Sequence, residues 1–327
     1  MIASAALLVA IALFARPSHA QDAAGLDTTP HQTRLVGVAE GVDIEVVDWG
    51  GVGPGLVFLS GLGDTAHAFD KFAPKFTKTN HVYGLTRRGF GRSSVPPPTD
   101  ANYDANRLGD DVVAIVDALK LDKPILVGHS IGGSELSSVG DRYPDKVSGL
   151  IYLDAAHHYA FYTPSNSLSW LIDAADLRRT FVEMGDGDGR SQKLALLKQS
   201  QTIFAQLQKT FETSLAALSY VPPGPVVPPT KSKAIRLVMA ANFRRHTEIR
   251  VPTLAIFATP PQCAPNCDQP GVKALAENVR LQADAFEAAI PAARVVRLPN
   301  ASHYVYRSNE ADVEREMNAF LTKINHK

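Results

Sequence analysis

The chain has 327 residues, of which 45% are hydrophobic and 20% are charged, and 33 basic residues balance 33 acidic ones. This length fits one large α/β domain with an inserted subdomain, or two domains. The balanced charge does not favour binding of nucleic acid or of an anionic membrane, so neither is expected as a partner.

The amino-terminal segment differs from the rest of the chain. Residues 2–15 are almost wholly apolar or small, and a small-x-small cleavage pattern ends at Ala20. This combination predicts a secretory signal peptide over residues 1–20, because the apolar run is short for a bilayer span. An uncleaved anchor is the alternative. Residues 21–32 are expected to form a flexible mature terminus of a periplasmic or secreted protein without membrane attachment.

The chain has only two cysteines, Cys263 and Cys267, and both lie in one loop. In an oxidising compartment, a local disulfide that closes this loop is the expected arrangement. Two ligands without a nearby histidine make a weak metal site. Neither a metal nor another cofactor is therefore expected.

Eight short apolar segments are typical of β-strands, and several are followed by segments with helical periodicity. The expected strands are residues 34–38, 42–48, 56–59, 81–86, 124–127, 149–154, 252–258 and 294–298. Alternating strands and helices predict a mostly parallel sheet covered on both faces. The first two strands suit an antiparallel edge hairpin, and residues 66–76 are expected to be helical.

The alternation of strands and helices stops between residues 157 and 250, where the pattern is mostly helical. The expected core therefore consists of residues 33–156 and 251–327, with residues 157–250 inserted as a helical cap. One apolar stripe is expected to run along the cap from Leu197 to Leu218. Five aromatic residues suggest a partly apolar pocket, although they suit the cap's own core equally well. They are Phe161, Tyr162, Trp170, Phe204 and Phe211.

The most informative motif is a Gly-x-Ser-x-Gly pattern, Gly128-His129-Ser130-Ile131-Gly132. It lies between an apolar strand and a helix predicted for residues 134–143. In this setting the serine sits on a sharp turn with its hydroxyl exposed, and the glycines let strand and helix approach closely. The amino terminus of the helix directs backbone N–H groups at the site, which favours a developing oxyanion.

Four motifs together resemble those of α/β-hydrolases with a helical cap. They are Ser60-Gly61-Leu62-Gly63, Arg88-Gly89-Phe90-Gly91-Arg92-Ser93, Gly128-His129-Ser130-Ile131-Gly132-Gly133 and Asn300-Ala301-Ser302-His303-Tyr304. The resemblance covers about residues 34–326, apart from the sequence of the cap, and implies an eight-stranded sheet. The chain departs from the family at Ser60, where a histidine is usual; the backbone role of Leu62 stays possible, but a usual side chain beside it is missing.

The resemblance implies a role for each candidate site residue. Ser130 is the expected nucleophile, which is weak without a base. His303 is the expected base, because it follows the last strand by a short loop and reaches the crevice at the carboxyl ends of the strands. The backbone N–H groups of Leu62 and Ile131 are expected to form the oxyanion hole.

The carboxylate that orients His303 has two candidates. Most relatives carry it just after the strand equivalent to residues 252–258, where this chain has no carboxylate before Asp268. Some capped relatives carry it at the end of the strand before the cap, where Asp154 stands. We favour Asp154, because a residue at the end of a strand can reach the site without a loop that has to fold back toward it. A bridge between the two cysteines that holds Asp268 inward keeps the second option open.

A serine at the elbow implies an acyl-enzyme and argues against dehalogenases and epoxide hydrolases, which have an aspartate there. The expected function is a secreted serine hydrolase that cleaves small-molecule carboxylic esters. The first alternative is an amidase or aminopeptidase, with Glu135 or Asp173 holding a substrate amine. The second is a catalytically silent binding protein for a small ligand, since no carboxylate directly follows the seventh strand.

Overall fold

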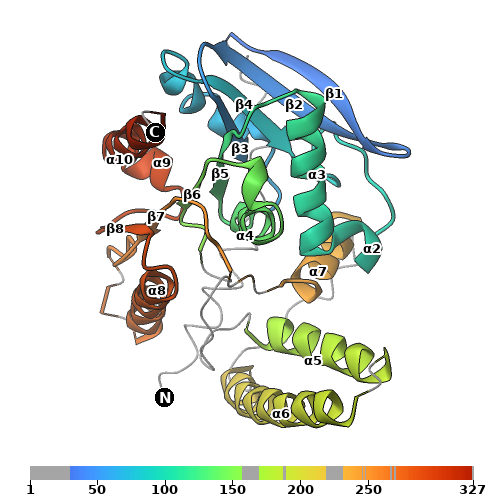
Figure 1. The fold of residues 1–327 in the computed structure, drawn as a ribbon. Helices are drawn as coiled ribbons and strands as arrows, with labels where there is room; N and C mark the ends of the chain where they lie inside the picture. Colours follow the sequence, from blue (N-terminus) through green and yellow to red (C-terminus); the bar gives the residue numbers. More distant parts are fainter. Residues whose placement is uncertain are drawn as a thin grey trace.

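The structure is a computed structural model, and its centre is an eight-stranded sheet with the order β1-β2-β4-β3-β5-β6-β7-β8 (Figure 1). It describes residues 30–156, 169–186, 189–218, 231–244, 246, 248–265, 267–268 and 270–325. The expected signal peptide, residues 1–20, lies outside the described residues.

All eight expected strands are present. They are β1 Gln32–Ala39, β2 Val42–Gly51, β3 Gly55–Leu59, β4 His81–Thr86, β5 Ile125–His129, β6 Gly149–Leu153, β7 Thr253–Ala258 and β8 Arg294–Leu298. The pairs β1–β2 and β2–β4 are antiparallel, and the other neighbours are parallel. The prediction of a mostly parallel α/β-hydrolase sheet is therefore confirmed.

The central strands are buried along their whole length, since every residue of β3, β5, β6 and β7 is buried. Successive side chains point to opposite faces of a strand. Leu126 and Tyr152 thus belong to the core on one face, and Val127 and Ile151 to the core on the other. Continuous apolar sequence is what a strand covered on both sides requires.

Helices cover both faces of the sheet. One core includes residues of α3 (Ala105–Ala118), α4 (Gly132–Arg142) and α8 (Pro270–Ala289). The other includes residues of α9 (Val305–Ser308) and α10 (Glu310–Asn325).

The helix expected over residues 66–76 is wrong in detail. The segment forms two short 3₁₀ turns, η1 (Ala66–Phe69) and η2 (Ala73–Phe76), which pack in the second core. Pro74 explains the break, because proline lacks a backbone N–H and its ring clashes with the preceding helical turn.

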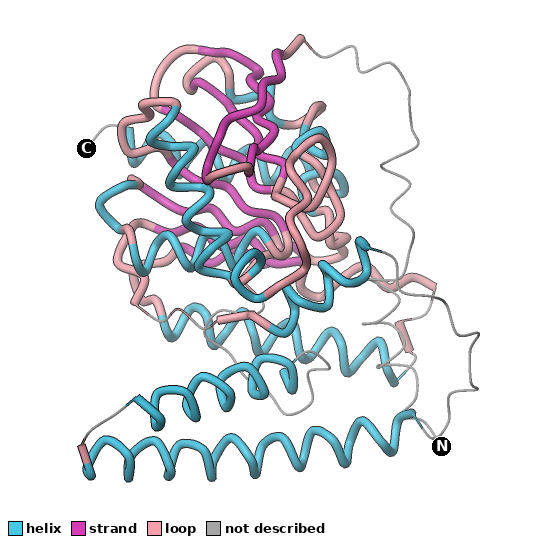
Figure 2. The backbone as a smooth tube through the Cα atoms, turned by 90° about the vertical axis from the view of Figure 1, so that its right-hand side faces the viewer, coloured by secondary structure: helices cyan, strands magenta, loops and turns pink. Residues whose placement is uncertain are grey.

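The described residues between β6 and β7 include three helices: α5 (Ser169–Asp186), α6 (Arg190–Leu218) and α7 (Lys231–Ala241). Helices α5 and α6 pack on each other through Leu177, Ile203 and Leu207, and lie outside the sheet layers (Figure 2). Helix α7 lies beside the short helix α2 (Asp100–Tyr103) (Figure 1). Among the described helices, none is both long and apolar enough to cross a membrane.

The buried face of α6 differs from the expected stripe. Leu197, Phe204 and Phe211 are about half exposed, while Leu196 and Ile203 are buried. Leu207, which also belongs to the expected stripe, is buried. The expected stripe is therefore the buried face only in part, and Phe204 and Phe211 do not form the cap's core. Phe161 and Tyr162 lie outside the described residues, and the side chain of Trp170 is not described.

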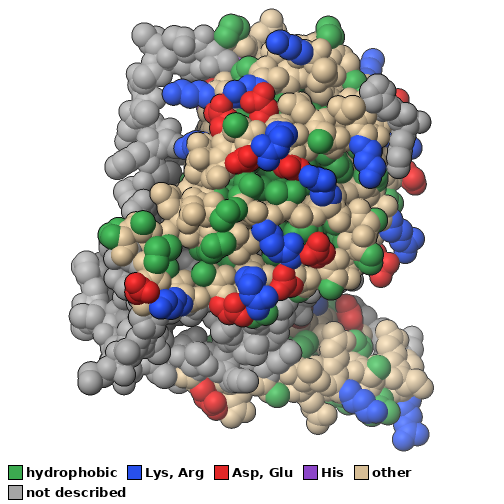
Figure 3. Space-filling model, turned by 90° about the vertical axis from the view of Figure 1, so that its left-hand side faces the viewer, with side chains coloured by type: hydrophobic (Ala, Val, Ile, Leu, Met, Phe, Trp, Pro, Cys, Tyr) green, Lys and Arg blue, Asp and Glu red, His purple; other side chains and the backbone are tan. Residues whose placement is uncertain are grey.

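Acidic and basic side chains are interspersed on the face drawn in Figure 3, and neither sign forms a continuous patch there. Many of these charges are paired. Arg297, for example, pairs with both Asp284 and Glu287 of α8. Exposed pairs of this kind contribute little to stability, typically up to about 1 kcal/mol.

Candidate active site

Ser130 occupies a strained turn between β5 and α4. Its φ of +55° lies in the left-handed region, which residues other than glycine rarely adopt. A Cβ on Gly128 would stand 2.8 Å from the backbone carbon of Gly132, and a Cβ on Gly132 would stand 2.9 Å from the carbonyl oxygen of Leu59. Both glycines are therefore needed for the strand and helix to approach, as expected of a nucleophile elbow.

His303 lies in the loop between β8 and α9, and its Nδ1 atom is 2.7 Å from Oδ2 of Asp154. A carboxylate only accepts hydrogen bonds, so Nδ1 carries the proton and Nε2 is the basic nitrogen of the neutral ring. The His303 side chain is 32% exposed, whereas that of Asp154 is 6% exposed. The imidazole thus has a buried, oriented side and an accessible side.

Asp154 is fixed at the end of β6 by the neighbouring strand β7. Its backbone N–H donates to the carbonyl of Ile256 (2.7 Å), and its Oδ1 accepts from the N–H of Ala258 (3.0 Å). Its φ of +47° turns the side chain back at the strand end. Asp154 therefore places its carboxylate beside the end of β7, where most relatives place theirs from β7 itself.

Asp268, the other candidate acid, lies elsewhere. Its side chain is fully exposed and pairs with Lys273 at 3.1 Å. Cys263 and Cys267 form a disulfide, as expected, but the bridge does not turn Asp268 inward. The geometry thus pairs His303 with Asp154 and not with Asp268.

His129 forms a hydrogen bond with the backbone of the loop that carries His303. Its ring is 1% exposed, and Nε2–H donates to the backbone carbonyl of His303 at 3.0 Å. Burial lowers the pKa of His129 well below its usual value, and the nearby His303 lowers it further. His129 therefore stays neutral and keeps this donor. Sequence analysis missed the role, and its signal is a polar residue in a fully buried strand, which must find a partner.

The two candidate oxyanion donors come from two separate turns, one after β3 and one directly after Ser130. Leu62 belongs to a tight turn after β3, closed by a hydrogen bond from Asp64 N–H to Gly61 O at 3.2 Å. Ile131 directly precedes α4, and both side chains contact one apolar cluster. In the described part of the chain, neither N–H donates to a protein acceptor. Both amides are thus available to an external oxygen.

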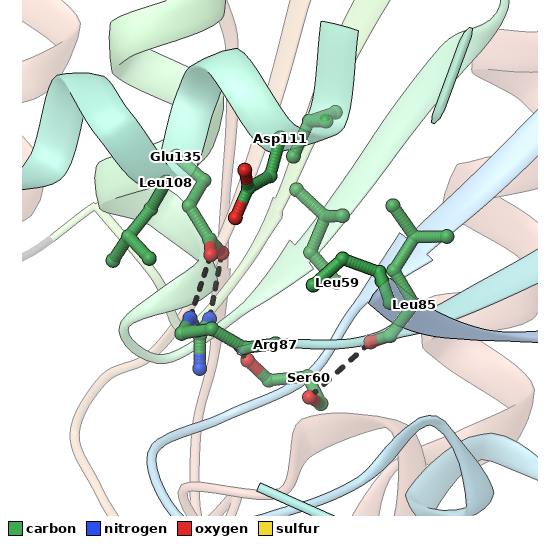
Figure 4. Close-up of a pocket in the computed structure, with 9 residues that line it drawn as sticks. Leu59, Ser60, Leu85, Arg87, Leu108, Asp111 and Glu135 are labelled. Atoms are coloured by element: carbon green, nitrogen blue, oxygen red, sulfur yellow. Dashed lines mark hydrogen bonds and ion pairs between the residues drawn. The ribbon is translucent and has the colours of Figure 1, made fainter. Parts of the chain in front are cut away.

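The turn that carries Leu62, residues 60–64, is called the oxyanion loop below. Ser60 replaces the usual histidine and is 1% exposed. Its hydroxyl faces the carbonyl oxygens of Asp64 (3.2 Å) and Leu85 (3.5 Å) (Figure 4). The hydroxyl therefore serves the loop's own backbone.

A buried ion pair holds the backbone of the oxyanion loop. Arg87 donates to both carboxylate oxygens of Glu135 at 2.6 Å, and the two side chains are 3% and 5% exposed (Figure 4). The same guanidinium donates to the carbonyl of Ser60 at 2.9 Å. Burial raises the pKa of Glu135, and the charge of Arg87 opposes that rise. Arg87 thus joins the first turn of α4 to the oxyanion loop.

The pairing of Arg87 with Glu135 argues against Glu135 as the residue that holds a substrate amine in an amidase. Glu135 is occupied by Arg87 and buried, so it is not a group that holds a substrate amine. The side chain of Asp173 is not described. Arg88 is likewise buried and paired with Asp111, so this arginine pair serves the interior. The sequence alone does not reveal these partners.

Among the described residues, no group of three or more His, Cys, Asp or Glu side chains is arranged to hold a metal ion.

The sequence model of the α/β hydrolase fold family matches residues 54–309. Together with the sheet order and the elbow, this match shows that the chain belongs to the α/β-hydrolase fold family. It is 28% identical to 2-(acetamidomethylene)succinate hydrolase of Mesorhizobium japonicum over 104 residues, 32% of this chain and 36% of that one. It is 33% identical to a bifunctional esterase/perhydrolase of Acinetobacter calcoaceticus over 130 residues, 39% and 46% of the two chains.

The aligned part of the chain thus spans between a third and a half of the length of these curated relatives. Among solved structures, a thermophilic esterase of Thermogutta terrifontis has a TM-score of 0.57 and 19% identity, covering 90% of this chain and 99% of that one. At this identity the likeness concerns the fold. The family and its hydrolase and esterase relatives identify a hydrolase-type enzyme scaffold.

Proposed function

We propose that this protein is a secreted serine hydrolase that cleaves carboxylic esters through an acyl-enzyme. The observation that carries the proposal is the hydrogen bond between His303 and Asp154, in a chain whose Ser130 stands on a left-handed elbow. It leaves Nε2 of His303 as a base for a nucleophilic hydroxyl.

In the proposed first half-reaction, His303 Nε2 accepts the proton of Ser130 Oγ as Oγ bonds to the ester carbonyl carbon. The oxygen of the tetrahedral intermediate accepts hydrogen bonds from the N–H groups of Leu62 and Ile131. Donors of this kind contribute roughly 3–4 kcal/mol each. Asp154 stabilises the imidazolium, which then gives its proton to the departing alkoxide.

In the second half-reaction, water loses a proton to His303 Nε2 as it attacks the acyl carbon. Collapse of the second intermediate returns that proton to Ser130 Oγ and releases the carboxylic acid. The supports described above give this cycle fixed geometry: His129 holds the backbone of His303, and Arg87 holds the oxyanion loop. Preorganised donors cost no rearrangement during the reaction.

Secretion is part of the proposal. Its support is the apolar segment over residues 2–15 with the cleavage pattern that ends at Ala20. The disulfide between Cys263 and Cys267 adds to this support, because such bonds persist in oxidising compartments.

The proposed reaction is tested with the mature protein on p-nitrophenyl esters of graded acyl length and on amino-acid p-nitroanilides. Ester turnover that Ser130→Ala and His303→Gln both abolish, with folding unchanged by circular dichroism, supports the esterase. Faster turnover of anilides than of esters would make it an amidase. Absence of Ser130-dependent turnover across the panel would leave a silent binding protein.

A further inference from the structure

Arg236 of helix α7 lies directly on the oxyanion loop. A Cβ at Gly63 would stand 2.5 Å from Nη2 and 3.3 Å from Cζ of Arg236, so the guanidinium lies against the backbone of Gly63. Gly63 also has a φ of +89°, which favours glycine. Gly63 follows Leu62, whose amide is a proposed oxyanion donor. Arg236 thus contacts the residue that follows a proposed oxyanion donor.

Helix α7 is packed so that this contact is held in place. Its residues Ile235 and Met239 are almost fully buried in the apolar cluster that contains Ile131, and Leu62 packs against the same cluster. Helix α7 is thus packed against both candidate oxyanion residues, and this packing places the backbone of Arg236 beside the oxyanion loop.

The charge of Arg236 has no protein partner in the described part of the chain. Its Nε atom is buried and makes no hydrogen bond there. Other arginines of the inserted segment do pair with acids. These are Arg178 with Asp100, Arg179 with Asp176 and Arg244 with Asp104. The guanidinium charge of Arg236 is therefore not neutralised by any described acid and is available to an anionic ligand.

We propose that Arg236 binds a carboxylate of the substrate, so that the preferred ester carries an anionic group near its scissile bond. The two Nη groups of a guanidinium form a pair of donors that matches the two oxygens of a carboxylate, and in Arg236 they are not among the buried unpaired atoms, whereas Nε is. This inference rests on the proposed esterase and specifies the class of its substrate. Arg236 is the specificity-determining residue, while Ser130, His303 and Asp154 carry the reaction.

The test compares anionic esters with neutral ones of the same size. For a carboxylate on the leaving group, para-acetoxybenzoate is compared with para-acetoxybenzamide. For a carboxylate on the acyl chain, mono-p-nitrophenyl adipate is compared with p-nitrophenyl hexanoate. We expect the wild-type kcat/KM to favour the anionic ester of at least one pair by about tenfold or more, as a charge-assisted bidentate contact implies.

Three variants test whether the preference for the anionic ester depends on Arg236. Arg236→Met is expected to bring the ratio close to one, mainly through KM for the anionic ester, with the neutral ester changed less than about twofold. Arg236→Lys is expected to restore only part of the ratio, because an ammonium lacks the planar pair of donors. Lys233→Met, which removes one exposed positive charge from the same helix, is expected to keep it. Equal wild-type rates within both pairs, or equal losses on both members of a pair in Arg236→Met, would overturn the proposal.

Calorimetric binding of para-acetoxybenzoate and adipate to the Ser130→Ala protein separates the two claims. If Arg236→Met removes this binding, and the wild-type protein hydrolyses no ester, the carboxylate site is kept and the esterase is refuted. Ser130-dependent hydrolysis without either an anionic preference or Arg236-dependent binding would keep the esterase and refute the carboxylate site.

Discussion

His303 Nδ1 lies 2.7 Å from Asp154 Oδ2, although the two residues are 149 positions apart in the chain. The sheet makes this contact possible. Asp154 ends β6, His303 follows β8, and β7 lies between these two strands. Because the three strands are parallel, their carboxyl ends meet at one edge of the sheet, and the loops that follow them lie together.

Asp154→Asn is expected to lower kcat by about 10⁴, because an amide in place of the carboxylate favours the wrong tautomer of His303. Ester kinetics at saturating substrate measure the effect. Asp268→Asn is the matched control and is expected to leave kcat unchanged, since Asp268 is fully exposed and pairs with Lys273. A large loss in the control, with little loss in Asp154→Asn, would reverse the assignment.

Removing one member of the Arg87–Glu135 pair is expected to destabilise the protein strongly. Arg87→Met or Glu135→Leu leaves a buried charge without its partner, at a cost of about 3–5 kcal/mol in the free energy of unfolding. Urea unfolding of both single variants and of the double variant measures the coupling. The double variant is expected to cost clearly less than the sum of the two.

The same variants test the link between this pair and the oxyanion loop. Arg87 also donates to the carbonyl of Ser60, so its loss is expected to lower kcat more than it raises KM. Additive losses of stability in the double variant, with an unchanged kcat in the folded Arg87→Met protein, would contradict the role of the pair.

His129 gives the stability a defined pH dependence. Burial depresses the pKa of His129 in the folded protein, while the unfolded chain takes up a proton near the ordinary pKa of about 6.5. The unfolded state therefore binds more protons as the pH falls, and folding stability decreases. We expect wild type to lose up to about 1.4 kcal/mol per pH unit below 6.5 relative to His129→Gln, which does not titrate there.

This difference is measured as the gap between the unfolding free energies of the two proteins from pH 7.5 down to about pH 5. Contributions from other groups largely cancel in the gap. A gap that stays constant over this range would show that His129 is not held neutral by burial.

Gly133→Ala is expected to destabilise the protein. A Cβ at Gly133, in the first turn of α4, would stand 1.8 Å from the carbonyl oxygen of Ala155, and backbone is not easily displaced. Overpacking of this kind costs about 1–3 kcal/mol or more. Gly185→Ala in α5 is the control, because a Cβ there meets nothing within 4 Å. Thermal melts of both variants give the comparison, and equal Tm values would refute the close approach.

The sequence predicts the sheet well, because each central strand is a short, continuous apolar run. Ser130 and His303 are also readable, since the elbow motif and the place after the last strand are local features. The prediction for residues 66–76 is wrong, because the apolar residues there suit both a helix and two 3₁₀ turns, and Pro74 decides between them. The buried face of α6 is predicted only in part, because the buried side of a cap helix depends on its neighbours.

Long-range partners are the part that the sequence could not supply. Arg87 and Glu135 are 48 residues apart, and no local pattern couples them. Arg236 lies in a segment without a motif, and its contact with Gly63 exists only once α7 packs on the oxyanion loop. The choice between Asp154 and Asp268 likewise depended on which carboxylate the folded chain brings to His303.

The proposed nucleophile is tested most directly by labelling the mature protein with a fluorophosphonate and locating the adduct by peptide mass spectrometry. One adduct per chain on Ser130, absent in Ser130→Ala and strongly slowed in His303→Gln, is the expected result. Labelling of another residue, or no labelling of a folded protein that still hydrolyses esters, would contradict the account.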